Sequence, residues 1–160
     1  MNYKTNFFKK VITSIYDIKV FSKYAKEGLL RSIFYAILLM IILSGIKGIA
    51  NVYKIDNFEL MTFIYNTTSN FGVGLSNLLF NCLIVTVVAS LFTIFMQMVV
   101  RYKALFSLTL YAATLPLIIQ SILEIVKPDI NFDTMFIIGT LTYVILILKY
   151  LKDEIIKNLN

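Results

Sequence analysis

Residues 75–100 read LSNLLFNCLIVTVVASLFTIFMQMVV, a stretch of 26 residues without a charged side chain. A helix needs about 20 predominantly apolar residues to cross the hydrocarbon core of a bilayer. Backbone groups in lipid can bond only to one another, so a spanning segment of this kind must be a helix. This stretch therefore predicts a membrane protein of the all-α class.

Three other apolar stretches accompany it, and they predict further spans near residues 29–49, 104–123 and 132–151. The uncharged parts of the first and last stretches, residues 32–46 and 134–148, are short, but Lys47 and Lys149 follow them directly. A lysine stem can lie in hydrocarbon while its ammonium reaches the headgroups. The chain of 160 residues is 59% hydrophobic, which exceeds the roughly 45–50% of a soluble domain. We therefore expect a polytopic membrane protein with four transmembrane helices.

Basic residues are divided unequally between the two sides of these spans. Twelve of the 15 lie on one side: before the first span or at its start, between the second and third spans, or at the end of the fourth and after it. The other side holds Lys47, Lys54 and Lys127. Because positively charged segments stay in the cytoplasm, we expect both chain ends there, the N-in/C-in topology. The chain has a net charge of +6. In this topology its basic residues face anionic lipid, so the expected partner is the lipid bilayer and not nucleic acid.

The segment 1–28 precedes the first span and has a different pattern. Apolar residues recur every three or four positions from Phe7 to Phe21, and most of the lysines lie off this stripe. The pattern is typical of an amphipathic helix that lies in the cytoplasmic interface of the membrane. Such a helix either orients the first span or serves as a docking surface for a partner, and we favour the first role.

Little of the chain is expected outside the membrane. The spans leave an outer loop over 50–74, which includes the polar run Asn66–Asn70, and a short cytoplasmic tail over 152–160. A loop of this length is too short to form a catalytic domain with its own core.

Polar side chains within the second span form two groups. Asn77 and Asn81 lie one turn apart on one face, and a second group between Thr86 and Gln97 points in nearly the opposite direction. These side chains either bond to neighbouring helices, at about 0.6 kcal/mol per contact, or line a path for a polar ligand or ion. We favour the first interpretation because no charged residue accompanies them.

The third span combines a small, polar face with a proline. Four residues share that face: Ser107, Tyr111, Thr114 and Ser121. Small and hydroxyl-bearing residues let another helix approach closely, so this face predicts a helix–helix interface. Pro116 removes a backbone donor and its ring clashes with the preceding turn, so we expect a kink. The kink either serves gating or only shapes the helix.

Residues suited to catalysis or metal binding are scarce. The chain has no histidine, its single cysteine, Cys82, lies in mid-span, and no charged residue falls in the centre of a span. Without histidine, most zinc, haem and general-base chemistry is unavailable. Proton-coupled transport usually needs an ionisable group within the membrane, so that class is disfavoured too. We therefore expect no enzymatic activity, no cofactor and no metal site.

Two parts of the chain carry a recognisable pattern. Residues 101–116 read RYKALFSLTLYAATLP, and the N-terminal segment has FFKK at 7–10, SIYD at 14–17 and KEG at 26–28. Together they resemble the uncharacterised bacterial membrane proteins grouped as the domain of unknown function 1189 family. A weaker likeness is to Yip1-type membrane domains. The resemblance implies a multi-pass protein of the bacterial plasma membrane and supplies no catalytic residues.

Two hypotheses about function follow from the residues. The first is a non-enzymatic membrane protein that acts by association with itself or with a membrane-protein partner. It would use the face from Ser107 to Ser121 or the N-terminal amphipathic helix. The alternative is a small permease or channel subunit whose polar path runs near Asn77 and Asn81.

Overall fold

A computed structural model describes residues 6–52 and 60–159, without the side chains of residues 52, 158 and 159. The described chain forms helices joined by turns, which confirms the all-α class. The elements are α1 (Phe7–Tyr16), η1 (Ile18–Val20), α2 (Phe21–Tyr24), α3 (Leu29–Val52), α4 (Leu60–Phe95), α5 (Tyr102–Ala112), α6 (Thr114–Val126) and α7 (Asp133–Leu159).

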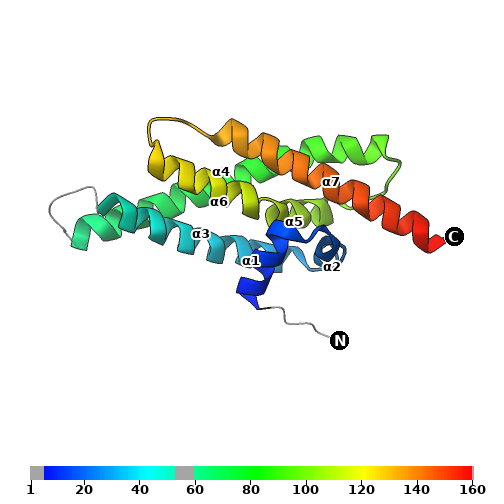
Figure 1. Ribbon diagram of the computed structural model, residues 1–160, viewed down its shortest axis with the longest axis horizontal. Coiled ribbons are helices and arrows are strands. Elements are labelled where there is room, and N and C mark those ends of the chain that lie inside the picture. Colours follow the sequence, from blue (N-terminus) through cyan, green and yellow to red (C-terminus); the bar gives the residue numbers. More distant parts are fainter. Residues whose placement is uncertain (1–5, 53–59, 160) are drawn as a thin grey trace.

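The long helices α3, α4, α6 and α7 run side by side along the longest axis of the molecule (Figure 1). Three helices are long and apolar enough to cross a membrane, over Leu29–Asn51, Leu60–Phe95 and Asp133–Lys157. The bent pair of α5 and α6 adds a fourth if it counts as one span. The described residues therefore contain three helices that could span a bilayer, or four.

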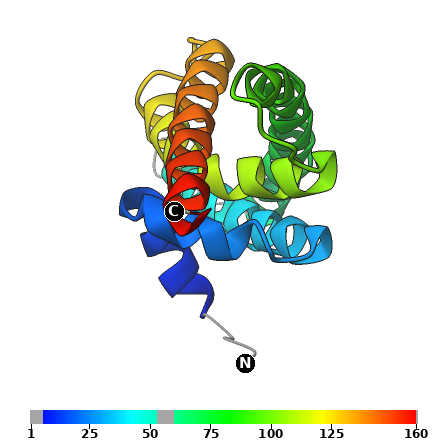
Figure 2. The same cartoon turned by 90° about the vertical axis from the view of Figure 1, so that its right-hand side faces the viewer.

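The two ends of the bundle differ in what they contain. At one end, here called the loop end, α3 finishes and the turn 127–132 joins α6 to α7 (Figure 1). At the other, the terminal end, α4 finishes, α5 begins and α7 runs out to the C-terminus. Figure 2 shows this end, where α1 and α2 lie across the bundle and the end of α7 faces the viewer.

A break at Ala113 divides the third predicted span into α5 and α6, whose axes differ by 43°. Pro116 has no N–H to donate to the carbonyl of Ala112, four residues earlier, and its ring crowds that carbonyl. The regular ladder resumes with the N–H of Leu117, which donates to the Ala113 carbonyl at 2.9 Å. The break therefore lies at the turn that a proline at this position disrupts.

The second span was expected over 75–100, but α4 starts 15 residues earlier and ends at Phe95. The polar run Asn66–Asn70, expected in an outer loop over 50–74, is helical and continues the apolar turn that begins at Leu60. Gln97 ends the helix with a left-handed backbone (φ 56°), and the next N–H reaches back to the Thr93 carbonyl. The helix therefore begins outside the apolar section, within the loop expected over 50–74, and Gln97 ends it inside that section, before Val100.

The other predicted boundaries also shift. Helix α3 begins at Leu29 as expected and extends to Val52, so residues 53–59, outside the described part of the chain, separate it from α4. Helix α7 runs from Asp133 to Leu159 without a break, so the expected tail over 152–160 continues the helix as far as it is described. At its start, the Asn131 side chain accepts a hydrogen bond from the Asp133 N–H at 2.7 Å.

The N-terminal segment is not one interfacial helix, because it folds back onto the bundle. Asp17 stops α1 with an extended backbone, and its carboxylate accepts a hydrogen bond from the Lys19 N–H at 3.0 Å. Phe21 is completely buried against the bundle, whereas the edge of α1 that carries Phe8 and Tyr16 is exposed. The predicted apolar stripe therefore divides between the protein interior and the outer surface.

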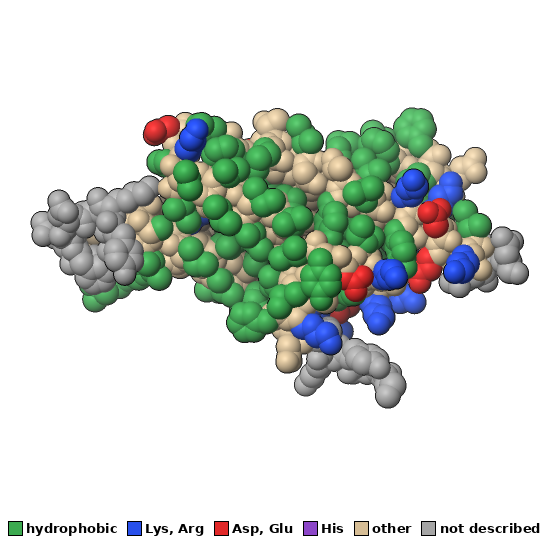
Figure 3. All heavy atoms as spheres, in the orientation of Figure 1, with side chains coloured by type: hydrophobic (Ala, Val, Ile, Leu, Met, Phe, Trp, Pro, Cys, Tyr) green, Lys and Arg blue, Asp and Glu red, His purple; other side chains and the backbone are tan. Residues whose placement is uncertain are grey.

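The interior and the outer surface of the bundle are both apolar. Fully buried side chains of α4, among them Cys82, Val85 and Ala89, pack against α3, α5 and α7. Figure 3 shows a hydrophobic surface across the middle of the molecule, with most of the visible Lys, Arg, Asp and Glu side chains toward the terminal end. A surface of this kind suits lipid as the surrounding solvent.

Candidate polar vestibule

The main polar cavity of the described residues opens at the loop end between α3, α4, α6 and α7. An inner compartment of about 140 Å³ adjoins an outer one of about 450 Å³. The two share part of their lining: Lys47, Asn70, Asn77, Glu124 and Asp133. We call the two compartments together the vestibule.

An ion pair closes one wall of the vestibule. Lys47 of α3 contacts Oε2 of Glu124 of α6, and the two side chains are 22% and 32% exposed. Gln120, one helical turn before Glu124, donates from Nε2 to Glu124 Oε1 at 2.8 Å and to Asp133 Oδ1 at 3.1 Å. One amide therefore links two carboxylates from different helices, while a single ammonium neutralises one of them.

Three asparagines of α4 line the opposite wall. Asn70, Asn77 and Asn81 recur at seven and four residues, so they lie on one face of the helix. Asn81 is the deepest, and only 9% of its surface is exposed. Within the described residues its side-chain amide has no hydrogen-bond partner. The amide atoms are not among the described side-chain atoms that are closed off from solvent without a partner, so Asn81 presents free donors and a free acceptor to the cavity.

The predicted polar path near Asn77 and Asn81 therefore lies on the wall of a cavity. Leu78 and Leu117 also line the inner compartment, and Val85, one turn beyond Asn81 toward the terminal end, is completely buried. The vestibule is open toward the loop end and closed by packed residues toward the terminal end. Cys82, next to Asn81 in sequence, faces away from the vestibule and is fully buried.

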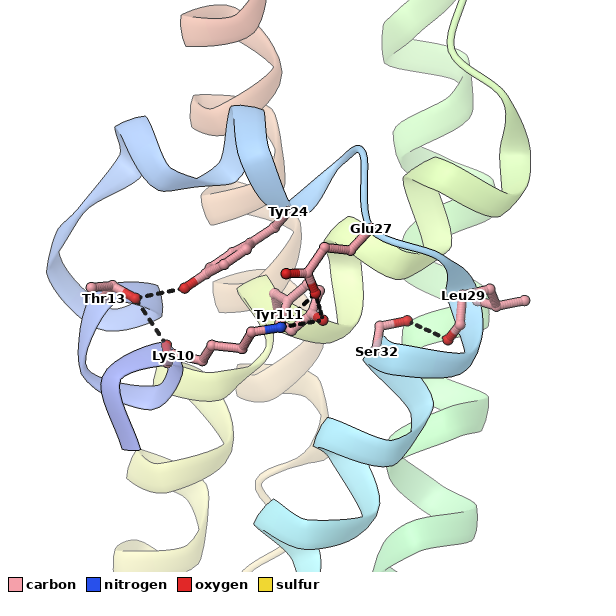
Figure 4. A network of polar contacts seen from close by, with 7 residues as sticks. All are labelled: Lys10, Thr13, Tyr24, Glu27, Leu29, Ser32 and Tyr111. Carbon is pink, nitrogen blue, oxygen red and sulfur yellow. Dashed lines mark hydrogen bonds and ion pairs between the residues drawn. The ribbon is translucent and has the colours of Figure 1, made fainter. Parts of the chain in front are cut away.

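A second polar cluster, the terminal network, joins the N-terminal segment to the break in the third span (Figure 4). Lys10 Nζ lies 2.5 Å from Glu27 Oε2, and the Tyr111 hydroxyl donates to the same oxygen at 2.7 Å. The ammonium also lies 5.4 Å and 5.3 Å from the ring centroids of Tyr24 and Tyr111. Lys10 was expected on the lysine-rich reverse face of an interfacial helix, but it points into the bundle.

Hydroxyl groups extend the terminal network on both sides of Tyr111. Thr13 Oγ1 lies 2.7 Å from the Tyr24 hydroxyl, and Tyr35 of α3 lies 2.8 Å from Thr114 of α6. Burial raises the pKa of Tyr24 above its ordinary value, so the phenol stays neutral and can donate to Thr13. The hydroxyls of these four residues all have partners.

The predicted helix–helix face on the third span is buried within the chain. Its four residues expose no more than 4% of their surface: Ser107, Tyr111, Thr114 and Ser121. Tyr111 stacks near Tyr24 and Tyr35, with ring centroids 4.8 Å and 4.9 Å away. The face therefore contacts helices of the same chain and is not exposed for a partner in this conformation.

The charged residues of the vestibule were not identified from the sequence. Lys47, Glu124 and Asp133 each lie near the end of a predicted span, and such residues are commonly solvated. Gln120 four residues before Glu124 places two polar side chains on one face of a helix. This spacing, together with the opposite charge of Lys47 at the same end of the bundle, was the feature of the sequence from which the charged site could have been predicted.

Comparison with known proteins identifies one family. The family model described as "Protein of unknown function (DUF1189)" matches residues 8–59 and 48–148. The weaker likeness to Yip1-type domains has no support in these comparisons. Neither a curated protein nor a solved structure matches the chain.

Proposed function

The chain belongs to the DUF1189 family, described as being of unknown function, and we propose that it binds a small polar solute in the vestibule. In this proposal it is a four-span protein of the bacterial plasma membrane and acts as a permease or permease subunit. Association with a partner, the other function expected from the sequence, becomes the second candidate.

The observation that carries this proposal is the unpartnered amide of Asn81. Asn81 is 9% exposed, and its amide lines the inner compartment without a partner from the described part of the chain. The inner compartment beside it has about 140 Å³, close to the about 150 Å³ of a cavity that holds benzene. A small solute or a few waters would supply the missing hydrogen bonds.

The charge distribution supports an orientation in which the vestibule opens to the outside. Basic residues such as Lys19, Arg101 and Lys152 belong to the terminal end, and the loop end has fewer. Positively charged segments stay in the cytoplasm. The proposed topology therefore keeps both chain ends inside the cell and turns the loop end outward.

The break at Ala113 supports a transport role over simple capture. Binding sites of membrane transporters are often formed beside discontinuous helices, which can tilt between two arrangements. Helix α6 follows the break and carries Leu117, Gln120 and Glu124 into the vestibule lining. In this view the described conformation is the one open to the outside, and tilting of α6 would open the other side.

Cysteine accessibility tests the proposal. Cys82 is the single cysteine, so Cys82→Ala gives a background in which Asn77→Cys and Asn81→Cys can be labelled individually. A membrane-impermeant thiol reagent added to intact cells should modify both positions. The matched control is Val85→Cys, one turn deeper and fully buried, which should not react. Failure of both vestibule positions to react would overturn the proposal.

The second candidate function, association, rests on the exposed edge of α1. Phe8 and Tyr16 are 71% and 70% exposed, and contiguous exposed apolar groups mark contacts with membranes or proteins. The candidate is tested by Ile12→Glu, which places a charge on this edge. Cross-linking in native membranes should lose a partner or self-contact if the edge binds protein, and should be unchanged if it contacts only lipid.

A further inference from the structure

The vestibule has an excess of negative charge. Its lining contains three carboxylates, Glu124, Asp129 and Asp133, and one ammonium, Lys47, which gives a formal charge of −2. Lys127 is exposed in the same turn as Asp129 but is not part of the lining. A recess with low-dielectric walls concentrates the field of such charges, so cations enter it preferentially.

The polar contacts of the vestibule leave Asp133 without a cation. Glu124 uses one oxygen for Lys47 and the other for the Gln120 amide. Asp133 accepts from the same amide through Oδ1, and no ion pair in the described part of the chain involves it. Charge-assisted hydrogen bonds are stronger than neutral ones, so an ammonium is better matched to Asp133 than a neutral donor.

Asn81 is an independent indication that the recess receives a ligand. It lies beneath the carboxylates on the α4 wall, is nine-tenths buried and has no partner among the described residues. Its amide can donate to a hydroxyl or carbonyl and accept from a hydroxyl. A ligand that bonded to both the carboxylates and Asn81 would carry a cationic group and a polar group.

From this arrangement we infer that the vestibule selects a small organic ammonium ion, with Asp133 and Glu124 facing its charge and Asn81 its second polar group. The described residues offer no cluster of three or more His, Cys, Asp or Glu side chains that could hold a metal. The inner compartment, at about 140 Å³, has room for much more than a single water molecule, which needs about 10–15 Å³ by the same measure. This inference rests on the proposed function, since it names the class of solute.

Charged thiol reagents separate the two proposals. The Asn77→Cys variant in the Cys82→Ala background is modified with a cationic and with an anionic methanethiosulfonate reagent. Each modification rate is divided by the rate of the same reagent with free cysteine, which removes the difference in intrinsic reactivity. We expect the cationic reagent to be favoured by about tenfold, within the range by which charged clefts accelerate association. Asp133→Asn should reduce this preference. Equal normalised rates would overturn the ammonium inference and leave the vestibule intact, whereas no reaction with either reagent would overturn the proposed function.

Protection experiments test the binding itself. Millimolar ethanolammonium carries an ammonium and a hydroxyl two carbons apart. At constant ionic strength it should slow the modification of Asn77→Cys, in the Cys82→Ala background that keeps Asn81, by a neutral thiol reagent several-fold. Glycerol and acetate at the same concentration should have little effect. Equal protection by all three, or by none, would contradict selection for an ammonium ion.

Discussion

The two polar clusters of this protein are built from the same kinds of residue but differ in how completely they are satisfied. Each contains a Lys–Glu ion pair between residues far apart in sequence: Lys10 with Glu27 and Lys47 with Glu124. In the terminal network every drawn contact is direct and aromatic rings enclose the ammonium (Figure 4). In the vestibule the pair borders a cavity, and Asn81 across it has no partner in the described chain.

This difference separates a structural cluster from a binding site. A fully satisfied buried network rigidifies the elements that it joins, and the terminal network joins α1, α3, α5 and α6. Unsatisfied polar groups around a cavity cost stability unless a ligand or water completes them. The contrast therefore predicts that substitutions in the terminal network lower stability strongly and change solute binding little. Substitutions in the vestibule should change solute binding strongly and stability little.

The largest effect is expected from Lys10→Met, which leaves the Glu27 carboxylate without its cation. The pair is shielded, with side chains only 12% and 14% exposed, and removing one partner of a buried pair costs about 3–5 kcal/mol. We expect a loss of about 3 kcal/mol in unfolding free energy, measured as a lower thermal midpoint in detergent. Adding Glu27→Gln should restore part of it.

Lys9→Met is the matched control for Lys10→Met. The Lys9 side chain is the exposed neighbour on the same helix, and surface substitutions of this kind usually change stability by less than about 0.5 kcal/mol. If both variants lost the same amount of unfolding free energy, positive charge near the membrane, and not the terminal network, would be what holds the N-terminal segment in place.

Gly48→Ala tests what holds the loop end together. A Cβ at this position would clash with Thr67 Oγ1 of α4 and would lie 3.1 Å from the Phe63 ring. Overpacking of this kind costs about 1–3 kcal/mol, and we expect about 2 kcal/mol in the same thermal assay. Thr67→Ala should relieve the clash in the double variant.

Gly45→Ala provides the control on the same helix. Nothing lies within 4 Å of the added methyl group, so the higher helix propensity of alanine should stabilise the chain by up to about 1 kcal/mol. A similar loss at both glycines would mean that α3 tolerates no side chain here for reasons other than contact with α4.

Lys47→Met should cost less than Lys10→Met although it also breaks a Lys–Glu pair. Its partner Glu124 is 32% exposed and borders the vestibule, so solvent can stabilise the carboxylate left behind. Pairs that solvent reaches contribute about 0–1 kcal/mol. A loss as large as that of Lys10→Met would show that the vestibule is dry and would remove the contrast between the two clusters.

Asn81→Leu should have the smallest effect on stability and a large effect on binding. The substitution removes no hydrogen bond among the described residues and adds apolar volume to the cavity, so the thermal midpoint should stay the same or rise. Protection of Asn77→Cys by ethanolammonium should disappear. A clear loss of stability would mean that Asn81 has a structural partner, and its role as a ligand contact would then be untenable.

The break at Ala113 shows what local sequence can predict. Pro116 acts on its own turn through a missing donor and a steric clash, so the disruption depends on nearby residues and can be anticipated without knowing the fold. The position of α4 is harder to predict, because a helix continues past the apolar section that identifies it. Asn70 was consequently assigned to a loop, although it lies on the vestibule wall.

The face from Ser107 to Ser121 shows a different limit. Small and hydroxyl-bearing residues on one side of a helix indicate that another helix approaches, but the pattern is the same whether that helix belongs to the same chain or to a partner. The pairing of Lys47 with Glu124, 77 residues later, is likewise a property of the folded arrangement. Each residue alone resembles an ordinary solvated charge at a helix end.

Helix α6 gives the break at Ala113 a mechanical consequence. Eleven residues separate Ala113 from Glu124, a lever arm of about 16 Å at 1.5 Å per residue. A tilt of about 10° at the hinge would carry the Glu124 carboxylate about 3 Å at the far end of that arm. This displacement equals the length of a hydrogen bond, so a slight movement beside Tyr35 and Thr114 is sufficient to make or break contacts in the vestibule.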